Sequence, residues 1–187
     1  MNKEVMEFSE KQEKITVCNG GKQALILTNE RIETRTPEGA DGSNADIEVY
    51  LYDGYWLTLD GLSVLDAVKQ QMLLEIDTYD KSDKVNGFKL NGMVVWLDKA
   101  TRVGLMNSTT IAKSMGSETT DLWLGDNKLT VECDKAIQLL SALEMYALEC
   151  FNVTAKHKKE VSELTTIEEV ESYDIKAGYP AQLEMNV

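Results

Sequence analysis

The stretch that decides the fold is residues 134–164, DKAIQLLSALEMYALECFNVTAKHKKEVSEL. Its apolar residues recur at alternating spacings of four and three, which is the pattern of a helix that turns one face inward. Further apolar residues widen this stripe at the start of the helix, so that part must be covered on more than one side. The inward-facing positions are Ala136, Leu140, Leu143, Ala147, Cys150, Thr154, His157, Val161 and Leu164.

Polar residues predict how this helix begins and how it ends. Asp134 is a candidate N-cap, because its carboxylate can accept hydrogen bonds from the free backbone N–H groups of the first turn. Beyond Val153 the pattern thins to lysines, and only Val161 and Leu164 remain apolar. The second half of the helix is therefore expected to leave the core with one face in solvent.

The residues around the long helix predict hairpins and further helices. Asn91-Gly92 is the strongest short signal for a tight hairpin, and Asp98 and Gly116 mark the start and the stop of a helix. The predicted C-terminal elements are a hairpin of Phe88–Leu90 and Met93–Leu97, a helix over Lys99–Met115, a hairpin of Asp121–Leu124 and Lys128–Glu132, the long helix, and a short helix from Thr165 to Tyr173, after which Gly178-Tyr179-Pro180 ends regular structure.

The first part of the chain is rich in strand-forming residues. Asp53-Gly54 lies between two aromatic and apolar runs and predicts a tight hairpin. Ser63 with Asp66 resembles the capping signal of a helix that ends near Tyr79. The predicted N-terminal elements are strands at Ile15–Cys18, Ala24–Thr28 and Arg31–Thr36, an exposed loop at Pro37–Asp46, the hairpin of Ile47–Tyr52 and Tyr55–Leu59, and the helix.

Together these elements predict an α+β fold with two domains. Residues 1–80 would form a β-rich N-terminal module with one helix, and residues 88–187 a C-terminal domain built on the long helix at 134–164. Antiparallel strands that pack against helices are typical of this class. The polar segment Asp80–Asn86 would link the two. Its acidic spacing resembles a calcium-binding loop, but the twelfth position holds Asn91 instead of a glutamate, so calcium is not expected there.

The charge of the chain argues against several classes of partner. The 187 residues carry a net charge of −13, and no basic stripe is interleaved with aromatic residues, so nucleic-acid binding is not expected. No run approaches the roughly 20 apolar residues that span a bilayer, and Met1–Glu13 is too charged for a secretory signal peptide. We therefore expect a soluble protein without a membrane association. Cys18, Cys133 and Cys150 are expected to be free thiols in a reducing cytosol.

The sequence offers no group that is suited to catalysis or to metal binding. His157 is the single histidine and lies between two lysines, and no serine or cysteine around it has the context of a nucleophile. Gly20-Gly21-Lys22 lacks the spacing of a phosphate-binding loop. Glu168 and Glu169 begin a short helix, where capping explains the pair. The sequence therefore predicts a protein that is not an enzyme and that uses no metal and no cofactor.

The predicted hairpin at 47–59 is unusually aromatic, with Tyr50, Tyr52, Tyr55 and Trp56. Such a surface could stack on the sugar rings of a glycan or on a partner chain. Alternatively, the same side chains pack against the first helix, which is the simpler interpretation. The hairpin is one candidate interaction surface of the chain.

Four blocks between Phe88 and Pro180 carry a resemblance to a known family. They are VWLDKATRVGL at 95–105, TDLW at 120–123, AIQ at 136–138 with LEMYA at 143–147, and TIEEVESYD at 166–174 with AGYP at 177–180. With these blocks the segment resembles a C-terminal domain family of uncharacterised biochemical function, found in tail, tail-fibre and baseplate-associated proteins of tailed phages and prophages. The opening half is similar to the short N-terminal module that accompanies this domain in phages of gut bacteria.

The resemblance implies a structural virion protein of a tailed bacteriophage and brings no active site with it. Such a protein is assembled in the host cytoplasm, contacts other phage structural proteins in the tail, and is expected to form a symmetric homo-oligomer. Val161 and Leu164, as exposed apolar positions on the second half of the long helix, would then be buried between subunits or against a neighbouring virion protein. The alternative is a receptor-recognition module that contacts surface glycans through the aromatic hairpin at 47–59.

Overall fold

A computed structural model describes residues 3–36, 46–124 and 127–186 of the chain. Strands dominate the first part and helices the second, so the predicted α+β class is confirmed. The chain divides into two compact units, which are described in turn. Unit 1 comprises Met1–Met72 and Thr165–Glu171, and unit 2 comprises Leu73–Leu164 and Ser172–Val187.

The boundary between the units differs from the predicted domains at 1–80 and 88–187. The boundary falls inside the first helix, because the last turns of that helix contact residues of unit 2. Asp80 at the end of this helix accepts a hydrogen bond from Thr154 Oγ1 at 2.7 Å. The segment 81–86, predicted to be a linker, likewise belongs to unit 2.

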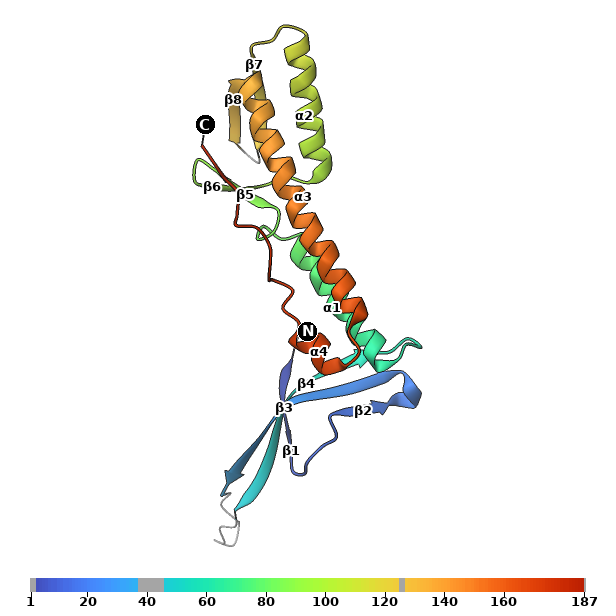
Figure 1. Ribbon diagram of the computed structural model, residues 1–187. Coiled ribbons are helices and arrows are strands. Elements are labelled where there is room, and N and C mark those ends of the chain that lie inside the picture. The colour runs from blue at the N-terminus through green and yellow to red at the C-terminus, as the bar shows by residue number, and fades with distance from the viewer. Residues whose placement is uncertain (1–2, 37–45, 125–126, 187) are drawn as a thin grey trace. The chain divides into compact units, whose positions relative to one another are not determined.

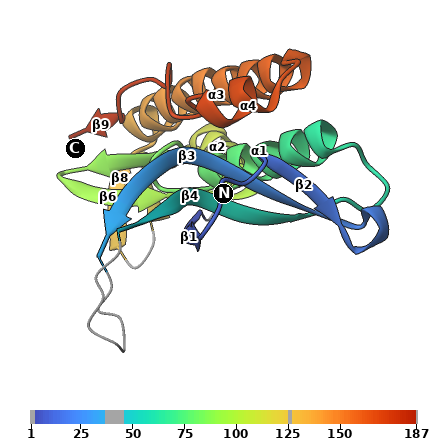
Figure 2. The same cartoon turned by 90° about the horizontal axis from the view of Figure 1, so that it is seen from below.

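Unit 1 contains a four-stranded antiparallel sheet with the strand order β1-β4-β3-β2 (Figure 2). Strand β1 has no counterpart among the predicted elements, because its five residues, EVMEF, are too few to show a period. The elements are β1 (Glu4–Phe8), β2 (Ile15–Cys18), the 3-10 helix η1 (Asn19–Gly21), β3 (Gln23–Arg35), β4 (Ile47–Thr58), the first part of α1 (Val64–Asp80) and most of α4 (Ile167–Ser172).

Strand β3 joins two strands that the sequence predicted separately. Its pairing with β4 shifts between Thr28 and Arg31, and Asn29 has a φ of 51° at this bulge. Asparagine tolerates that left-handed conformation better than most residues. A bulge therefore interrupts the apolar pattern without ending the strand. The loop predicted at 37–46 lies outside the described residues except for Asp46.

The predicted hairpin at Asp53-Gly54 is wrong, because β4 continues through both residues. A Cβ on Gly54 would lie 2.6 Å from Met6 Sδ and 2.7 Å from Leu27 Cδ2. The glycine thus makes room for the side chains of neighbouring strands and does not form a turn. Asp53 pairs instead with Arg31 of β3 at 2.8 Å.

Both helices of unit 1 begin with the caps that the sequence predicts. The N–H of Asp66 donates to Ser63 Oγ at 3.1 Å at the start of α1. At α4 the N–H of Glu169 donates to Thr166 Oγ1 at 3.2 Å, and the N–H of Thr166 donates to Glu169 Oε2 at 3.0 Å. This reciprocal pair is a capping box.

Unit 2 contains two small sheets and the long helix (Figure 1). One sheet has the order β6-β5-β9, and the other is the pair β7-β8. Helix α2 packs beside the first half of α3, which also contacts β7 and β8. The elements are the end of α1, β5 (Gly87–Leu90), β6 (Met93–Trp96), α2 (Lys99–Ser114), β7 (Thr119–Leu124), β8 (Asn127–Glu132), α3 (Cys133–Glu163) and β9 (Glu184–Met185).

The local signals in this unit act as the sequence predicts. Asn91 and Gly92 have φ values of 48° and 81°, as a tight turn between β5 and β6 requires. Asp98 caps α2 by accepting a hydrogen bond from the N–H of Thr101 at 2.9 Å. Gly116, with a φ of 87°, follows the end of this helix. The β7–β8 hairpin is confirmed, although residues 125–126 of its predicted turn lie outside the described residues.

The apolar stripe of α3 faces inward as predicted. Its buried residues are Cys133, Ala136, Leu140, Leu143, Tyr146, Ala147, Cys150, Thr154, His157 and Val161. The prediction of Asp134 as N-cap is wrong, because the cap position is Glu132, whose side chain makes no capping bond. Asp134 lies in the first turn, where it is favourable to the helix dipole, and pairs with Lys113 of α2.

The chain forms a further strand after the point where regular structure was predicted to end. Strand β9 runs parallel to β5, with the N–H of Lys89 donating to Leu183 O at 2.8 Å and that of Asn91 to Met185 O at 2.9 Å. Lys89 Nζ also pairs with Glu184 at 2.6 Å. Two residues are too short to show a period, so no sequence pattern predicts β9.

Candidate functional site

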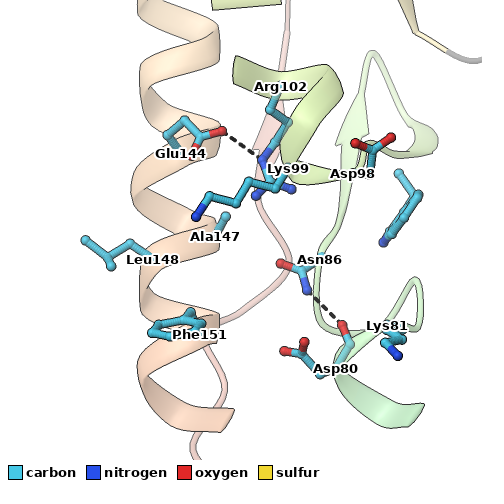
Figure 3. Close-up of a pocket in the computed structure, with 11 residues that line it drawn as sticks. Asp80, Lys81, Asn86, Asp98, Lys99, Arg102, Glu144, Ala147, Leu148 and Phe151 are labelled. Atoms are coloured by element: carbon cyan, nitrogen blue, oxygen red, sulfur yellow. Dashed lines mark hydrogen bonds and ion pairs between the residues drawn. The ribbon is translucent and has the colours of Figure 1, made fainter. Parts of the chain in front are cut away.

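Unit 2 contains a groove of about 390 Å³ beside α3. One wall is α3, and the other is formed by the end of α1, the segment that follows it, and the start of α2 (Figure 3). We call this site the α3 groove. Its apolar lining residues are Trp96, Ala147, Leu148 and Phe151, and its polar lining residues are Asp80, Lys81, Asn86, Asp98, Lys99, Arg102 and Glu144.

The three carboxylates of the α3 groove are bonded to other groups of the protein. Glu144 Oε1 accepts from Arg102 Nε at 2.9 Å, as Figure 3 shows. Asp98 caps α2, and its hydrogen bonds with Thr101 hold the pKa of this carboxyl below its usual range. Asp80 accepts from the hydroxyl of a threonine on α3. Glu144 is therefore ion-paired, whereas Asp80 and Asp98 accept hydrogen bonds from neutral groups and keep their negative charge.

Two of the cationic side chains of the groove form no ion pair with the described residues. Lys81 and Lys99 are exposed and have no ion-pair partner in the described part of the chain. Arg102 is buried, and its Nη1 donates to the carbonyl oxygen of Leu97 at 2.7 Å. Its Nη2 has no protein partner among the described residues. The groove therefore carries three cationic and three carboxylate side chains, which balance in formal charge, beside an apolar lining.

The wall that follows α1 is fixed by hydrogen bonds and close packing. Asn86 Nδ2 donates to the carbonyl oxygen of Asp80 at 2.7 Å. The carbonyl oxygen of Val85 accepts from Tyr146 Oη at 2.8 Å and from Cys150 Sγ at 2.9 Å, both on α3. Burial raises the pKa of both of these α3 side chains. They therefore stay protonated as donors, and the wall is held in one geometry.

The aromatic residues predicted as an interaction surface do not lie on one exposed face. Tyr52 and Tyr55 are buried, Tyr50 is half-buried, and Trp56 is exposed. Tyr52 Oη accepts from the N–H of Gln12 at 3.1 Å. Because the predicted turn is absent and β4 is continuous, Tyr50, Tyr52 and Trp56 lie on one face of the strand and Tyr55 on the other. Of the four side chains, only that of Trp56 is exposed.

Tyr55 lies in a polar cluster of unit 1 that also contains Lys3 and Glu171. Lys3 Nζ lies 5.8 Å from the ring centroid of Tyr55 and 3.4 Å from Glu171 Oε1. Burial is the main reason that the pKa of the Tyr55 hydroxyl is raised, and the neighbouring carboxylate of Glu171 raises it further. The role of Tyr55 is therefore to pack inside unit 1.

The two long-helix residues predicted at a subunit interface are not free surface either. Val161 is fully buried, and Leu164 is half-buried. The prediction that Val161 is exposed and available to a partner is wrong. The buried face of α3 therefore extends along the helix as far as Val161, although the sequence around this residue is polar.

His157 is buried and has a structural environment. Its Nδ1 lies 2.6 Å from Tyr173 Oη, and its Nε2 lies 2.9 Å from the carbonyl oxygen of Ala177. Tyr173 Oη also donates to Glu160 at 2.5 Å, which lowers the pKa of that carboxyl. This chain of hydrogen bonds fastens the segment after α4 to α3.

All three tryptophans of the chain are substantially exposed. Trp56, Trp96 and Trp123 have exposed fractions of 57%, 44% and 59%. Each lies in a strand and is followed directly by a buried leucine, at positions 57, 97 and 124. Neighbouring residues of a strand point to opposite faces, so a buried leucine directly after a tryptophan directs the tryptophan outward. The tryptophan–leucine pair in a strand is the sequence signal for this arrangement. Of the three tryptophans, only Trp56 is among the interaction residues that the sequence predicts.

Neither metal-binding clusters nor membrane-spanning helices occur in the part of the chain that the structure describes. Across residues 3–36, 46–124 and 127–186, no three histidine, cysteine, aspartate or glutamate side chains come together as metal ligands could. Within the same ranges, no helix has both the length and the apolar composition needed to cross a bilayer.

A family model described as "Domain of unknown function (DUF4376)" matches residues 67–177, more than half of the chain. The chain belongs to the DUF4376 family. All residues that line the α3 groove lie inside the DUF4376 match. No curated protein and no solved structure matches the chain.

Proposed function

We propose that this DUF4376 protein is a structural component of a tailed bacteriophage particle and that it acts by binding other proteins. Its place would be the tail, the tail fibre or its attachment, or the baseplate, after assembly in the host cytoplasm. The resemblance of the blocks at 95–105, 120–123, 136–147 and 166–180 to proteins of phage tails supports the phage assignment. The exposure of all three tryptophans is the observation that supports protein binding.

Covering an exposed tryptophan is favourable because the indole ring is large. Tryptophan buries on the order of 200 Å² when it is fully covered. Covering the exposed half of one ring would then contribute about 2.5 kcal/mol at about 25 cal/mol per Å². Tryptophan is also among the residues that dominate binding energy at protein interfaces. Three such side chains are therefore expected to contribute to contacts with other proteins.

Exposed apolar residues on α2 support self-association as part of this assembly. Val103 and Ile111 of α2, and Met115 at its C-cap, have exposed fractions of 42%, 59% and 79%, and their spacing places them on one side of the helix. Gly104 beside them has no atom within 4 Å of the position of a Cβ. A second helix could approach this side closely, as in a symmetric homo-oligomer.

The alternative of glycan recognition has less support. It depended on four aromatic side chains on one hairpin, and only Trp56 of these four is exposed. A single tryptophan can stack on one sugar ring but does not form a binding surface.

The test is to measure the assembly state and the location of the protein together. Light scattering after size-exclusion chromatography should give a mass well above the 20.9 kDa of one chain. Mass spectrometry should find the chain in purified particles of a phage or induced prophage that encodes it. A stable monomer that is absent from those particles would contradict the proposal.

Single tryptophan substitutions locate the contacts. Trp56→Ser, Trp96→Ser and Trp123→Ser are each expected to keep the circular dichroism spectrum, and at least one should reduce the assembled mass or incorporation into particles. Ile32→Ser is the matched control, since Ile32 is also exposed, at 55%, but is not aromatic. If all four variants assemble like the natural protein, the tryptophans are not the contacts.

A further inference from the structure

Strand β6 forms one edge of the sheet β6-β5-β9, and no other strand among the described residues lies along its outer side. We propose that a second copy of this chain pairs with β6 along this edge. The two β6 strands would run antiparallel about a twofold axis and join the two small sheets into one. The proposal rests on the proposed function, because it names the partner and the geometry of one contact in that assembly.

The direction of the backbone groups of β6 follows from the pairings of β5. The N–H groups of Lys89 and Asn91 donate toward β9, at 2.8 Å and 2.9 Å, and therefore point away from β6. Lys89 lies opposite Val94 in the β5–β6 pair. Two residues away, Gly87 lies opposite Trp96. Since bonded and unbonded pairs alternate in an antiparallel ladder, both of these pairs are unbonded. The N–H and C=O groups of Val94 and Trp96 thus point out from the open edge.

These outward groups have no backbone partner in the part of the chain that the structure describes. Within those residues, no backbone hydrogen bond joins Val94 or Trp96 to an element other than β5. A row of unpaired N–H and C=O groups on an edge strand is a template for a further strand. The edge of β6 therefore offers the main-chain half of a strand-pairing site.

Strand β6 also lacks the features that usually protect an edge. Its four residues, MVVW, include no charged residue and no proline. Met93, Val94 and Trp96 have exposed fractions of 45%, 56% and 44%. The opposite edge of the same sheet is different, because β9 has only two residues and one of them is Glu184. A short, charged edge resists pairing, whereas the edge of β6 invites it.

The sequence of β6 is complementary to itself in one antiparallel register. When Val95 lies opposite Val95 of the second copy, Val94 lies opposite Trp96 and Trp96 opposite Val94. Both outer pairs bring together outward-pointing backbone groups, so each pair exchanges two N–H···O=C hydrogen bonds. The side chains of Val94 and Trp96 lie on the exposed face, since Val95 between them is buried. An aromatic ring beside a β-branched side chain is a favourable cross-strand pair.

The charge of the chain and the symmetry of this register favour a second copy as the occupant. Two chains that each carry a charge of −13 repel each other except at surfaces that are locally neutral. Strand β6 is such a surface, and the residues on either side of it, Gly92 and Leu97, are uncharged as well. Only a symmetric pair requires the side chains of one strand to complement themselves. The pattern in β6 meets that requirement.

The size of the contact predicts its strength. Four strand residues span only about 13 Å, so this pairing alone buries less than the roughly 1,200 Å² of a stable interface. Exposed apolar surface continues from Trp96 to Leu148 and Phe151, which line the same groove and can add to the contact. The pair is therefore weak between free chains and strengthens where other contacts hold two copies together.

Amide hydrogen exchange of the ¹⁵N-labelled full chain tests the pairing residue by residue. The N–H groups of Val94 and Trp96 face solvent in the monomer, whereas that of Val95 bonds to β5 at every concentration. For a Kd near 0.1 mM, about four fifths of the chains are dimeric at about 1 mM. Exchange at Val94 and Trp96 should then slow about fivefold relative to a dilute sample, and exchange at Val95 should not change.

A mixture of labelled and unlabelled chains identifies the occupant. Isotope-filtered NMR spectra record only contacts between different molecules. They should show a nuclear Overhauser effect between the ring of Trp96 and the methyl groups of Val94, because directly opposite residues have Cβ atoms about 5 Å apart.

Variants of the edge test the register and the backbone separately. Val94→Glu should raise the dimer Kd about tenfold or more, since the symmetric pair loses its cross-strand contact twice. Val94→Pro removes an outward N–H that β5 does not use, and should abolish pairing. Leu74→Glu is the matched control, because Leu74 lies on α1 in unit 2 and is exposed to 55%. It should leave the Kd unchanged in sedimentation equilibrium. Circular dichroism checks the fold, and Val94→Glu alone suffices if the proline variant does not fold.

Several results would overturn the inference. One is that exchange at Val94 and Trp96 does not slow at about 1 mM, the weak end of specific binding. Another is the absence of the intermolecular contact between Trp96 and Val94, or a Kd that Leu74→Glu and Val94→Glu change equally. Protection of these amides only by a different protein would make that protein the occupant. None of these results affects incorporation of the chain into phage particles, so failure of this inference is distinguishable from failure of the proposed function.

Discussion

Replacing Gly87 by alanine tests the geometry of the wall that faces α3. A Cβ at this position would lie 2.1 Å from the carbonyl oxygen of Asp83. Favourable contacts between heavy atoms begin at about 3.5 Å, so the backbone would have to open by roughly 1.4 Å. Val85 lies between the two residues and is held to α3 by two hydrogen bonds, which resist that opening.

The expected cost follows from these contacts. Overpacking costs about 1–3 kcal/mol, and disturbing a buried hydrogen bond adds about 1 kcal/mol. We therefore expect Gly87→Ala to lower the free energy of unfolding by about 3 kcal/mol, or to lower Tm by about 6–12 °C for a chain of this size. Urea unfolding followed by circular dichroism, with linear extrapolation, measures the first quantity.

Gly104→Ala is the matched control in the same unit. It makes the same chemical change inside α2, where no atom lies within 4 Å of the new Cβ. Alanine is favoured over glycine inside a helix by about 1 kcal/mol, so this variant should be more stable than the natural protein. If Gly87→Ala loses less than about 1 kcal/mol, or if the two variants change stability in the same direction, the argument from close contact is refuted.

Three further perturbations test other parts of the fold. Tyr146→Phe removes the hydroxyl that donates to Val85 O and should lower the unfolding free energy by about 1 kcal/mol. The hydrogen bond from Arg31 lowers the pKa of Asp53 to about 2, below the unfolded value of about 3.9. The resulting stability is present above pH 3.9 and is lost as the pH falls through about 2, and Arg31→Ala should raise the pKa in a carboxyl NMR titration. Thr166→Ala removes the cap of α4 and should cost unit 1 about 1 kcal/mol in urea unfolding.

Each of these expectations has a result that contradicts it. Unchanged stability of Tyr146→Phe would mean that the hydroxyl is not bonded inside unit 2. An Asp53 titration near the unfolded value in the natural protein would remove the pairing with Arg31. A Thr166→Ser variant that is as unstable as Thr166→Ala would show that the hydroxyl does not cap α4.

Local signals predicted most of unit 2, and the exceptions have physical causes. The stripe of α3, the cap at Asp98 and the turn at Asn91-Gly92 depend on neighbours in sequence, so the sequence suffices. Asp53-Gly54 has the same composition as a turn, but the side chains of distant strands decide the role of that glycine. Strand β9 forms only because β5 offers an edge, and two residues carry no pattern of their own.

The α3 groove was harder to predict than the fold. Its lining comes from α1, the following segment, β6, α2 and α3, which only the tertiary structure brings together. Sequence alone also cannot tell that Lys113 forms an ion pair while Lys99 forms none with the residues that the structure describes. The outward direction of Trp96 was the one available clue, because Leu97 beside it has the burial of a core residue.

The pairing of β9 with β5 has a consequence for the order of folding. Lys89 and Glu184 are 95 residues apart in sequence, so closing this contact carries a large loop entropy and comes late. During synthesis on the ribosome, β5 and β6 form a hairpin without β9 until the chain has been translated past residue 185. In that interval the open edge of β5 is exposed to other nascent chains, which makes this strand a point where a chaperone would benefit yield.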